Sequence, residues 1–339
     1  MYINFILTQM QQLKYFMPLI IEANKRSISS RVYYTSVKKC YAEPSNHMNV
    51  LKEYSDQYRF DLLPYTTQFE GLTFLLENRW PSNLPHKTYK VVLPLMLSFT
   101  HSSFYDVYIN QVNAVVFPSR FMAEHYGKTS PKNIYLGTPK YDVQLDEEVI
   151  RQKYDIQTKK NALLVYPHPM GGGELDLQEI TDRLHNLGYT VIVKSRNKFS
   201  TYLKNRNLPI FEGDRYFEDV TWFPHTMLEL MEISDVVINT DSSTNKECVM
   251  LDTPLVNFHV KIDPARYPES RPYLYDYLYD YPFHIELDPQ TELDKLEESV
   301  EYLTEHNFSD YFIDARTKYL FPKGTNVSAK ILDEFSCHL

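Results

Sequence analysis

A polar turn between a buried strand and a short helix is the part of this sequence best suited to bind an anion. The turn follows an apolar strand predicted over residues 235–240, and a helix begins near Asn245. In an open α/β sheet, such a turn leads into a helix N-terminus, where free backbone N–H groups and the helix dipole attract phosphate. Glu247, one turn into the helix, is placed to accept hydrogen bonds from ribose or sugar hydroxyls. Ordinary helix capping is the alternative explanation of the turn, which consists of Asp241, Ser242, Ser243 and Thr244.

A histidine in the first half of the chain is a candidate general base. His101 follows the carboxyl end of an apolar strand and is flanked by Thr100, Ser102 and Ser103. A neutral imidazole at this point could take the proton from an acceptor hydroxyl as that hydroxyl attacks a donor. The alternative is a loop histidine that only makes local hydrogen bonds.

Three segments of the second half carry groups suited to a diphosphate and a nucleotide base. Glycines at 171–173 allow the backbone to approach a diphosphate closely. The basic residues that end the strand at 189–194 could neutralise a leaving nucleotide, and residues 222–225 could form the base pocket. The alternatives are a strand-to-helix turn, solvated charges and an ordinary helix start. Besides the turn and Glu247, we therefore expect donor contacts from His168, Gly171, Gly172, Lys194, Arg196 and His225.

The predicted elements that position these groups alternate between strands and helices. In the first half, strands are predicted over 2–8, 31–35, 60–64, 90–97, 112–118 and 133–136, and helices over 10–24, 44–58 and 119–126. In the second half, strands are predicted over 162–166, 189–194, 235–240 and 255–258, and helices over 175–187, 227–233, 292–304 and 327–335. This alternation predicts parallel sheets covered on both faces. A Tyr-, Asp- and Pro-rich segment over 264–282 has no clear period and is expected to be irregular.

The length of the chain indicates two domains. At 339 residues it exceeds the size at which a single core usually stops growing. Residues 140–160 are charged and have little core character, so we expect a linker there. We predict two Rossmann-like domains and a last helix that crosses back to the first domain; the family resemblance given below implies that the N-terminal domain binds the acceptor and the C-terminal domain the nucleotide donor. Their predicted ranges are 1–142, 143–320 and 321–339.

Several segments, in order along most of the chain, resemble landmarks of GT-B enzymes. Residues 235–243 are similar to "D-V-L-I-T-D-Y-S-S" of the CDP-glycerol glycerophosphotransferases of teichoic-acid synthesis, and residues 191–194 are similar to their "I-I-K-x-H-P" strand. Residues 162–167 resemble "I-L-Y-x-P-T". Residues 112–119 with 133–142 resemble "D-x-V-I-x-x-S … I-x-x-x-G-x-P-x-x-D", which ends the first domain. The resemblance implies an α/β fold of GT-B type, with two doubly wound Rossmann-like domains that face a central cleft.

The same resemblance implies a catalytic base and has clear departures. His101 lies in a segment similar to the "W-H-G-T" loop, whose histidine is regarded as a catalytic base. Ser102 replaces the glycine of that loop, and residues 195–196 stand where "x-H-P" is expected, so a second family histidine is missing. Glu247 lies six residues after Asp241, a spacing closer to "D-S-G-G-x-x-E-E" of UDP-N-acetylglucosamine 2-epimerase.

The resemblance implies a transferase that moves a glycosyl or polyol-phosphate unit from a UDP-, CDP- or GDP-linked donor to an acceptor hydroxyl. The acceptor would be a glycan, a lipid-linked compound or another hydroxyl compound of polysaccharide or glycoconjugate synthesis. Two alternatives stay open: a non-hydrolysing UDP-sugar 2-epimerase, and a non-catalytic sugar-nucleotide-binding subunit of a larger assembly. Residues 8–12 lack the Gly-x-Arg-x-Glu expected of an epimerase. No Asp-x-Asp metal motif is framed, so we expect neither a metal ion nor a cofactor.

The composition argues against several other classes of function. A formal net charge of −9 argues against nonspecific binding to nucleic acid or to an anionic membrane. Three widely separated cysteines without a C-x-x-C pair indicate a reducing compartment and no metal cage. No stretch reaches the roughly 20 apolar residues needed to span a bilayer. We expect a cytoplasmic enzyme, and the sequence leaves its oligomeric state open.

Overall fold

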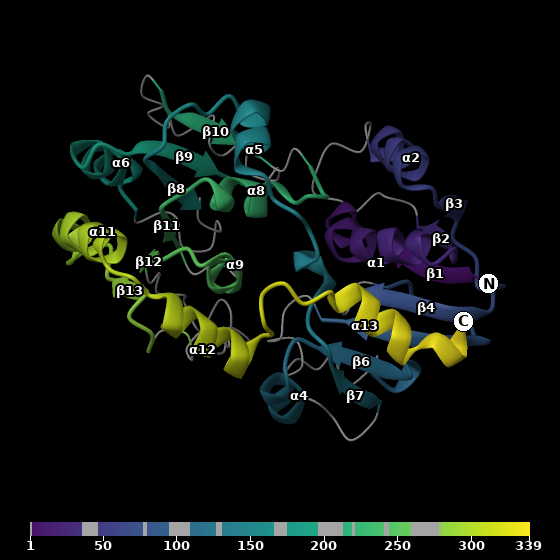
Figure 1. Ribbon diagram of the computed structural model, residues 1–339. Coiled ribbons are helices and arrows are strands. Elements are labelled where there is room, and N and C mark those ends of the chain that lie inside the picture. The colour runs from purple at the N-terminus through teal and green to yellow at the C-terminus, as the bar shows by residue number, and fades with distance from the viewer. Residues whose placement is uncertain are drawn as a thin grey trace. The chain divides into compact units, whose positions relative to one another are not determined.

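Two compact units make up the chain, each built on one parallel sheet (Figure 1). The first unit combines Met1–Val143 with Thr317–Leu339, and the second is Gln144–Arg316. The chain therefore passes from one unit to the other twice. The structure is a computed structural model that describes residues 2–35, 47–76, 80–94, 109–126, 131–165, 175–195, 213–218, 221–240, 244–258, 278 and 280–339.

The sheet of the first unit has seven parallel strands in the order β3-β2-β1-β4-β5-β6-β7. Strands β1, β4 and β6 are largely apolar and buried, as expected for a parallel sheet that is covered on both faces. The winding changes direction between β1 and β4, and open α/β sheets bind ligands at such a switch point. The strands are β1 (Tyr2–Leu7), β2 (Ser29–Tyr34), β3 (Asp61–Pro64), β4 (Gly71–Leu76), β5 (Thr88–Leu93), β6 (Ala114–Phe117) and β7 (Lys132–Tyr135).

The C-terminal helix of the chain belongs to the first unit and packs against its first helix. Figure 1 shows α13 (Val327–Glu334) in yellow beside α1 (Leu13–Lys25). Arg26, directly after α1, pairs with Asp333 at 2.5 Å and donates to the backbone oxygen of Ala329 at 3.3 Å. The other helices of this unit are α2 (His47–Tyr58) and α4 (Arg120–Tyr126), with 3-10 turns at Met10–Gln12, Ile109–Gln111, Pro139–Tyr141 and Ser336–His338.

Residues 137–142 form the support on which this C-terminal segment rests. Gly137 has a φ of +110°, and a Cβ atom there would lie 2.6 Å from Cγ2 of Val327, so the position requires glycine on two counts. Asp142 accepts hydrogen bonds from the backbone N–H groups of Val327 at 3.0 Å and Ser328 at 2.5 Å. Burial raises the pKa of Asp142. The glycine and the aspartate of the "G-x-P-x-x-D" landmark thus hold the first unit together.

The second unit has six parallel strands in the order β10-β9-β8-β11-β12-β13, which is the same winding as in the first unit. The switch point lies between β8 and β11. The strands are β8 (Asn161–Val165), β9 (Thr190–Lys194), β10 (Arg215–Phe217), β11 (Val236–Asn239), β12 (Leu255–Phe258) and β13 (His284–Leu287). The helices are α5 (Glu147–Tyr154), α6 (Leu177–Asn186), α8 (Thr226–Glu232), α9 (Asn245–Leu251), α11 (Leu296–Glu305) and α12 (Ser309–Tyr319), which crosses the boundary between the units, with a 3-10 turn at Leu293–Lys295.

The chain passes from the first unit to the second between Val143 and Gln144, inside the 140–160 segment expected to be a linker, but most of that segment is part of the second unit. Helix α5 lies within it, and Ile150, Tyr154 and Ile156 are buried in a core cluster with residues of β8, β9, β11, α8 and α9. The helix buries only two apolar side chains, Ile150 and Tyr154, which lie one turn apart; its third apolar residue, Val149, is exposed and the others are charged or polar. The burial of Ile150 and Tyr154 depends on contacts with the rest of the unit, and the local sequence pattern does not reveal these contacts.

Besides α5, four described strands and helices were not predicted from the sequence: β4, β10, β13 and α12. Strand β4 lies at the centre of the first sheet, and β13 forms one edge of the second. Most of the segment expected to be irregular, 264–282, lies outside the described residues. None of the described helices is long and apolar enough to cross a membrane.

Candidate functional site

Two charged residues predicted to bind the donor are buried at the carboxyl edge of the second sheet. Lys194 is the last residue of β9 and is 3% exposed, and its Nζ donates to the backbone oxygen of Ser195 at 2.6 Å. Glu247 lies in the first turn of α9 and is 8% exposed. Burying charge is costly unless the charge is well solvated by neighbouring groups. Lys194 is therefore not a solvated charge at the end of a strand.

These residues flank the switch point of the sheet. Lys194 ends β9, and β9 and β11 are the two neighbours of β8. The hydroxyl of Thr240, directly after β11, donates to the backbone oxygen of Val165 at 3.5 Å and so connects the ends of β11 and β8. Residues 241–243 lie outside the described residues, and the chain resumes at Thr244, which is buried and precedes α9. The described part of the turn therefore lies where an open α/β sheet binds its ligand.

A closed turn before α8 contains the aromatic residues predicted to receive a base. Its ends are joined by a hydrogen bond from the N–H of Thr221 to the hydroxyl oxygen of Thr226 at 3.0 Å. Trp222 and His225 form an antiparallel bridge, with their ring centres 6.2 Å apart, and the Phe223–Pro224 peptide bond is cis. His225 is buried at the N-cap of α8. The helix-start explanation of His225 is therefore correct for its backbone, and Trp222 is the partly exposed ring beside it.

A buried carboxylate fixes this turn to the rest of the unit. Glu229 on α8 accepts hydrogen bonds from Nζ of Lys153 at 2.7 Å, the hydroxyl of Tyr154 at 2.6 Å and the hydroxyl of Thr221 at 3.1 Å. Burial and the bond to Glu229 raise the pKa of Tyr154. Hydrogen bonds to an ionised acceptor are stronger than neutral ones. The network therefore ties the first residue of the turn to α5 and α8.

A row of polar side chains at the same edge was missed in the sequence. Asn239 on β11 pairs in register with Asn257 on β12, which pairs with Glu286 on β13. Residues paired in this way point to the same face of a parallel sheet. The partners are 18 and 29 residues apart in the sequence. Only the register of the sheet brings them together, and no local pattern signals it.

The remaining predicted site residues lie outside the described part of the chain. The structure therefore does not test the proposed base or the glycine-rich loop, and these stay predictions. Within the described residues, no group of three or more His, Cys, Asp or Glu side chains could hold a metal ion. The residues outside are His101, His168, Gly171, Gly172, Arg196, Asp241, Ser242 and Ser243.

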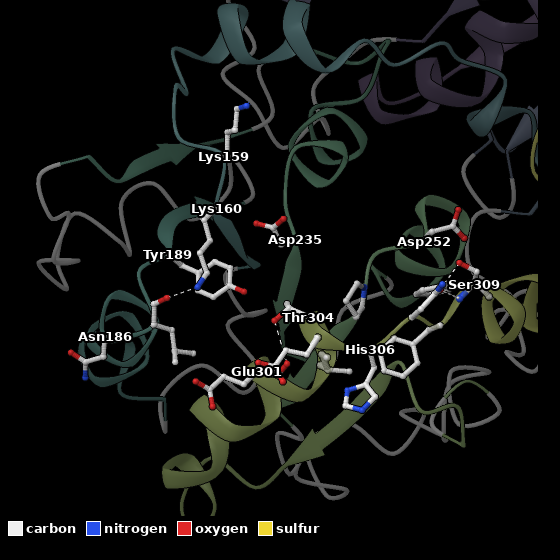
Figure 2. Close-up of a pocket in the computed structure, with 17 residues that line it drawn as sticks. Lys159, Lys160, Asn186, Tyr189, Asp235, Asp252, Glu301, Thr304, His306 and Ser309 are labelled. Carbon is white, nitrogen blue, oxygen red and sulfur yellow. Dashed lines mark hydrogen bonds between the residues drawn. The ribbon is translucent and has the colours of Figure 1, made fainter.

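A hollow of about 950 Å³ lies at the opposite, amino edge of the second sheet (Figure 2). Its lining includes Lys160, Tyr189, Asp235 and Pro254, each of which directly precedes a strand. Lys160 donates to the backbone oxygen of Leu187 at 2.6 Å, and burial raises the pKa of Asp235. Open α/β sheets bind their ligands outside the carboxyl ends of the strands. We therefore do not assign the donor to this hollow.

No protein-family profile and no curated protein matches the sequence. Solved structures share the fold. The wall teichoic acid polymerase TagF, in a variant soaked with CDPG, is 14% identical with a TM-score of 0.66, over 99% of this chain and 88% of that one. UDP-GlcNAc 2-epimerase from Neisseria meningitidis, bound to UDP-GlcNAc, is 13% identical with a TM-score of 0.62, over 99% and 100%. The Methanocaldococcus jannaschii epimerase, with UDP-GlcNAc and UDP, is 12% identical with a TM-score of 0.60, over 100% of both chains.

These similarities extend over both units of the chain and establish its fold. Two parallel α/β sheets, with seven and six strands, match the GT-B-like architecture of TagF and of the epimerases. The fold class predicted from the sequence is thus confirmed. At 12–14% identity the likeness shows the fold and leaves the reaction to be argued from the site.

Proposed function

We propose that the chain is a transferase that binds a nucleotide-diphosphate donor at the carboxyl edge of its second sheet. In this proposal the second unit holds the UDP-, CDP- or GDP-linked donor, and the first unit holds the acceptor hydroxyl. The observation that carries the proposal is the burial of Lys194 and Glu247 on either side of the β8–β11 switch point. A buried cation suits a diphosphate, and a buried carboxylate suits ribose or sugar hydroxyls.

The proposed chemistry is attack of the acceptor hydroxyl on the donor. For a glycosyl donor, the hydroxyl oxygen bonds to the anomeric carbon, the bond to the diphosphate oxygen breaks, and the nucleoside diphosphate leaves. For a polyol-phosphate donor, the oxygen bonds to the distal phosphorus and the nucleoside monophosphate leaves. In both cases His101 takes the hydroxyl proton. Lys194, with Arg196 and the turn at 241–244, offsets the negative charge that develops on the leaving group.

A thermal-shift panel tests the proposal directly. UDP-, CDP-, GDP- and dTDP-linked donors are added to the chain, and a ligand present at about 100 times its Kd stabilises the folded state by about 2.7 kcal/mol. We expect at least one donor class to raise the melting temperature by at least about 2 °C. Nucleotide release from that donor, with and without hydroxyl acceptors, then measures turnover. The proposal fails if no donor raises the melting temperature.

One observation favours a 2-epimerase as the second candidate. Glu247 is buried in the first turn of α9, as the "D-S-G-G-x-x-E-E" spacing would require. Against it, the first βα turn is closed by Gln12, whose side-chain oxygen accepts from the N–H groups of Thr8 at 2.6 Å and Gln9 at 3.0 Å. That turn offers amides where an epimerase is expected to carry an arginine and a glutamate. Epimerisation of UDP-GlcNAc without any acceptor, followed by NMR, would identify this activity.

The third candidate, a sugar-nucleotide-binding subunit without catalysis, makes a different prediction. Such a protein would give the same thermal shift with a donor but release no nucleotide with any acceptor. Nucleotide release by the wild type separates the cases, and in a transferase His101→Ala should lower that release by about 10² to 10⁴ and leave donor binding unchanged.

A further inference from the structure

The polar row at the carboxyl edge of the second sheet continues into helix α9. Nδ2 of Asn239 donates to Oδ1 of Asn257 at 3.0 Å and to Oδ1 of Asn245 at 2.7 Å. Nδ2 of Asn257 donates to Oε1 of Glu286 at 3.4 Å. The three asparagines are each at most 1% exposed. Strands β11 and β12 and the first residue of α9 are therefore joined by a buried chain of amides, and the exposed carboxylate of Glu286 extends this chain to β13.

The carboxylate at one end sets the direction of every amide in this chain. An ionised Glu286 can only accept hydrogen bonds, so Asn257 turns its NH₂ group toward it. The oxygen of Asn257 then faces Asn239, which must donate, and the second N–H of Asn239 is left for the oxygen of Asn245. The direction of these bonds leaves Asn245 with its oxygen occupied and its NH₂ group turned away from Asn239.

This NH₂ group is buried and has no acceptor among the residues that the structure describes. More than nine in ten buried polar groups in folded proteins have a hydrogen-bond partner, and an exception requires a reason such as a ligand or water. An apolar residue at this position would bury no polar group, so it would serve better if packing were the only role of the side chain. The location adds a reason, because Asn245 directly follows Thr244 and lies two residues before Glu247.

We propose that Nδ2 of Asn245 donates a hydrogen bond to an oxygen of the bound donor. This proposal rests on the proposed function and adds a contact that specifies the ligand. The chemistry required is an oxygen acceptor, which is either a phosphate oxygen of the nucleotide diphosphate or a hydroxyl oxygen of the group to be transferred. The row from Glu286 to Asn239 positions Asn245, because it occupies the amide oxygen and so leaves the NH₂ group to face the donor.

Asn245→Asp tests this proposal by replacing the NH₂ group with a second acceptor of the same size. Calorimetry is performed with the wild-type chain and with the variant, using UDP and UDP-GlcNAc in one pair of titrations, CDP and CDP-glycerol in a second, and GDP and a GDP-linked sugar in a third. We expect the Kd to rise at least about tenfold for whichever pair the wild type binds. Equal weakening for the free nucleotide and the linked donor assigns the oxygen to the nucleotide diphosphate. Weakening for the linked donor alone assigns it to the transferred group.

Two further variants keep the test decisive. Asn245→Leu removes the donor group without introducing a buried charge, so it replaces Asn245→Asp if the latter does not fold. Asn161→Asp is the matched control, because Asn161 is a fully buried asparagine at the amino edge of the same sheet, with Nδ2 bonded to the backbone oxygens of Thr158 and Ile233, both at 2.9 Å. It should lower the melting temperature and leave the Kd of the folded protein unchanged.

The outcomes separate this inference from the function on which it rests. If the wild type binds no nucleotide, both fail. If the wild type binds and both Asn245 variants bind with the wild-type Kd, the proposed function stands and the Asn245 contact is overturned. The amide row would then be a structural network whose last donor is satisfied by water.

Discussion

Burial distinguishes charged residues that look alike in the sequence. Lys160 and Lys194 both lie at ends of strands in the second unit, but Lys160 is exposed at the amino edge and Lys194 is buried at the carboxyl edge. Glu247 is likewise buried one turn into α9. An enzyme retains such residues at the expense of stability when they contact a ligand. Under the proposed function, this contrast is the reason for placing Lys194 and Glu247 against the donor.

A buried histidine outside the site predicts how stability depends on pH. Burial lowers the pKa of His284, at the start of β13, to about 3, whereas an unfolded histidine titrates near 6.5. Between about pH 6.5 and 3, the unfolded state therefore binds a proton that the folded state does not. Stability contributed by the neutral ring is complete above pH 6.5 and is lost as the pH falls through this window.

The variant His284→Leu replaces the imidazole with an apolar side chain of similar size and so removes this titration. Between pH 7 and pH 5, the free energy of unfolding of the wild type should fall by about 2 kcal/mol more than that of the variant. Urea unfolding of both proteins at the two pH values measures this difference. Asp142 and Asp235, whose pKa values are raised by burial, act in the opposite direction but cancel because both proteins contain them. Equal losses would show that His284 is protonated within the folded state.

At the scale of elements, the glycine of the "G-x-P-x-x-D" landmark has a structural role. Gly137→Ala should destabilise the first unit, because it strains a backbone with positive φ and drives a methyl group into Val327. We expect about 1–2 kcal/mol from the backbone and about 1–3 kcal/mol more from overpacking. Gly324→Ala is the control, since Gly324 has a φ of +79° and nothing within 4 Å of the added Cβ. Thermal unfolding that gives equal losses for the two variants would contradict the steric role.

The turn before α8 provides its own reporter of order. The chain has two tryptophans, so in a Trp80→Phe background the fluorescence comes from Trp222. Adding Glu229→Gln weakens the hydrogen bonds that Lys153 and Tyr154 donate to this side chain. Because the turn then loosens, we expect acrylamide to quench the fluorescence of Trp222 more strongly. The matched control is Glu179→Gln, which removes a partly exposed ion pair with Arg183 on α6. Equal quenching in both variants would show that the turn does not depend on the buried network.

The elements differ in how far the sequence could predict them. Strands with long apolar runs, such as β1 and β9, were predicted within about two residues. Helix α12 buries Phe312, Ala315, Arg316 and Tyr319, a helical spacing that the sequence does contain, and β4 is an apolar run of ordinary strand length, so both could have been found. Strand β10 has three half-buried residues, and α5 shows two apolar positions. The positions of β10 and α5 depend on tertiary contacts, because a segment with so few buried residues shows no recognisable periodicity.

At the scale of the whole molecule, the two units share one winding; the alternation of strands and helices predicted their parallel sheets, and the family resemblance implied that both are doubly wound. The site was less predictable. Lys194 ends, and Thr244 and Glu247 follow, strands that the sequence reveals, so their common edge could be inferred. Asn239, Asn257 and Glu286 are joined only by the register of three strands, one of which was not predicted. Long-range pairing of this kind has no local signal in a single sequence.

The central claim is that the carboxyl edge of the second sheet binds a nucleotide-diphosphate donor. Isothermal titration of the donor that stabilises the wild type tests it most directly, using Lys194→Met, Glu247→Gln and, as the control at the opposite edge, Lys160→Met. Loss of a charge-assisted hydrogen bond is worth about 1.5–3 kcal/mol, so the Kd should rise about 10- to 150-fold in the first two variants and stay unchanged in the third. Wild-type affinity in both Lys194→Met and Glu247→Gln, or an equal loss in Lys160→Met, would contradict the claim.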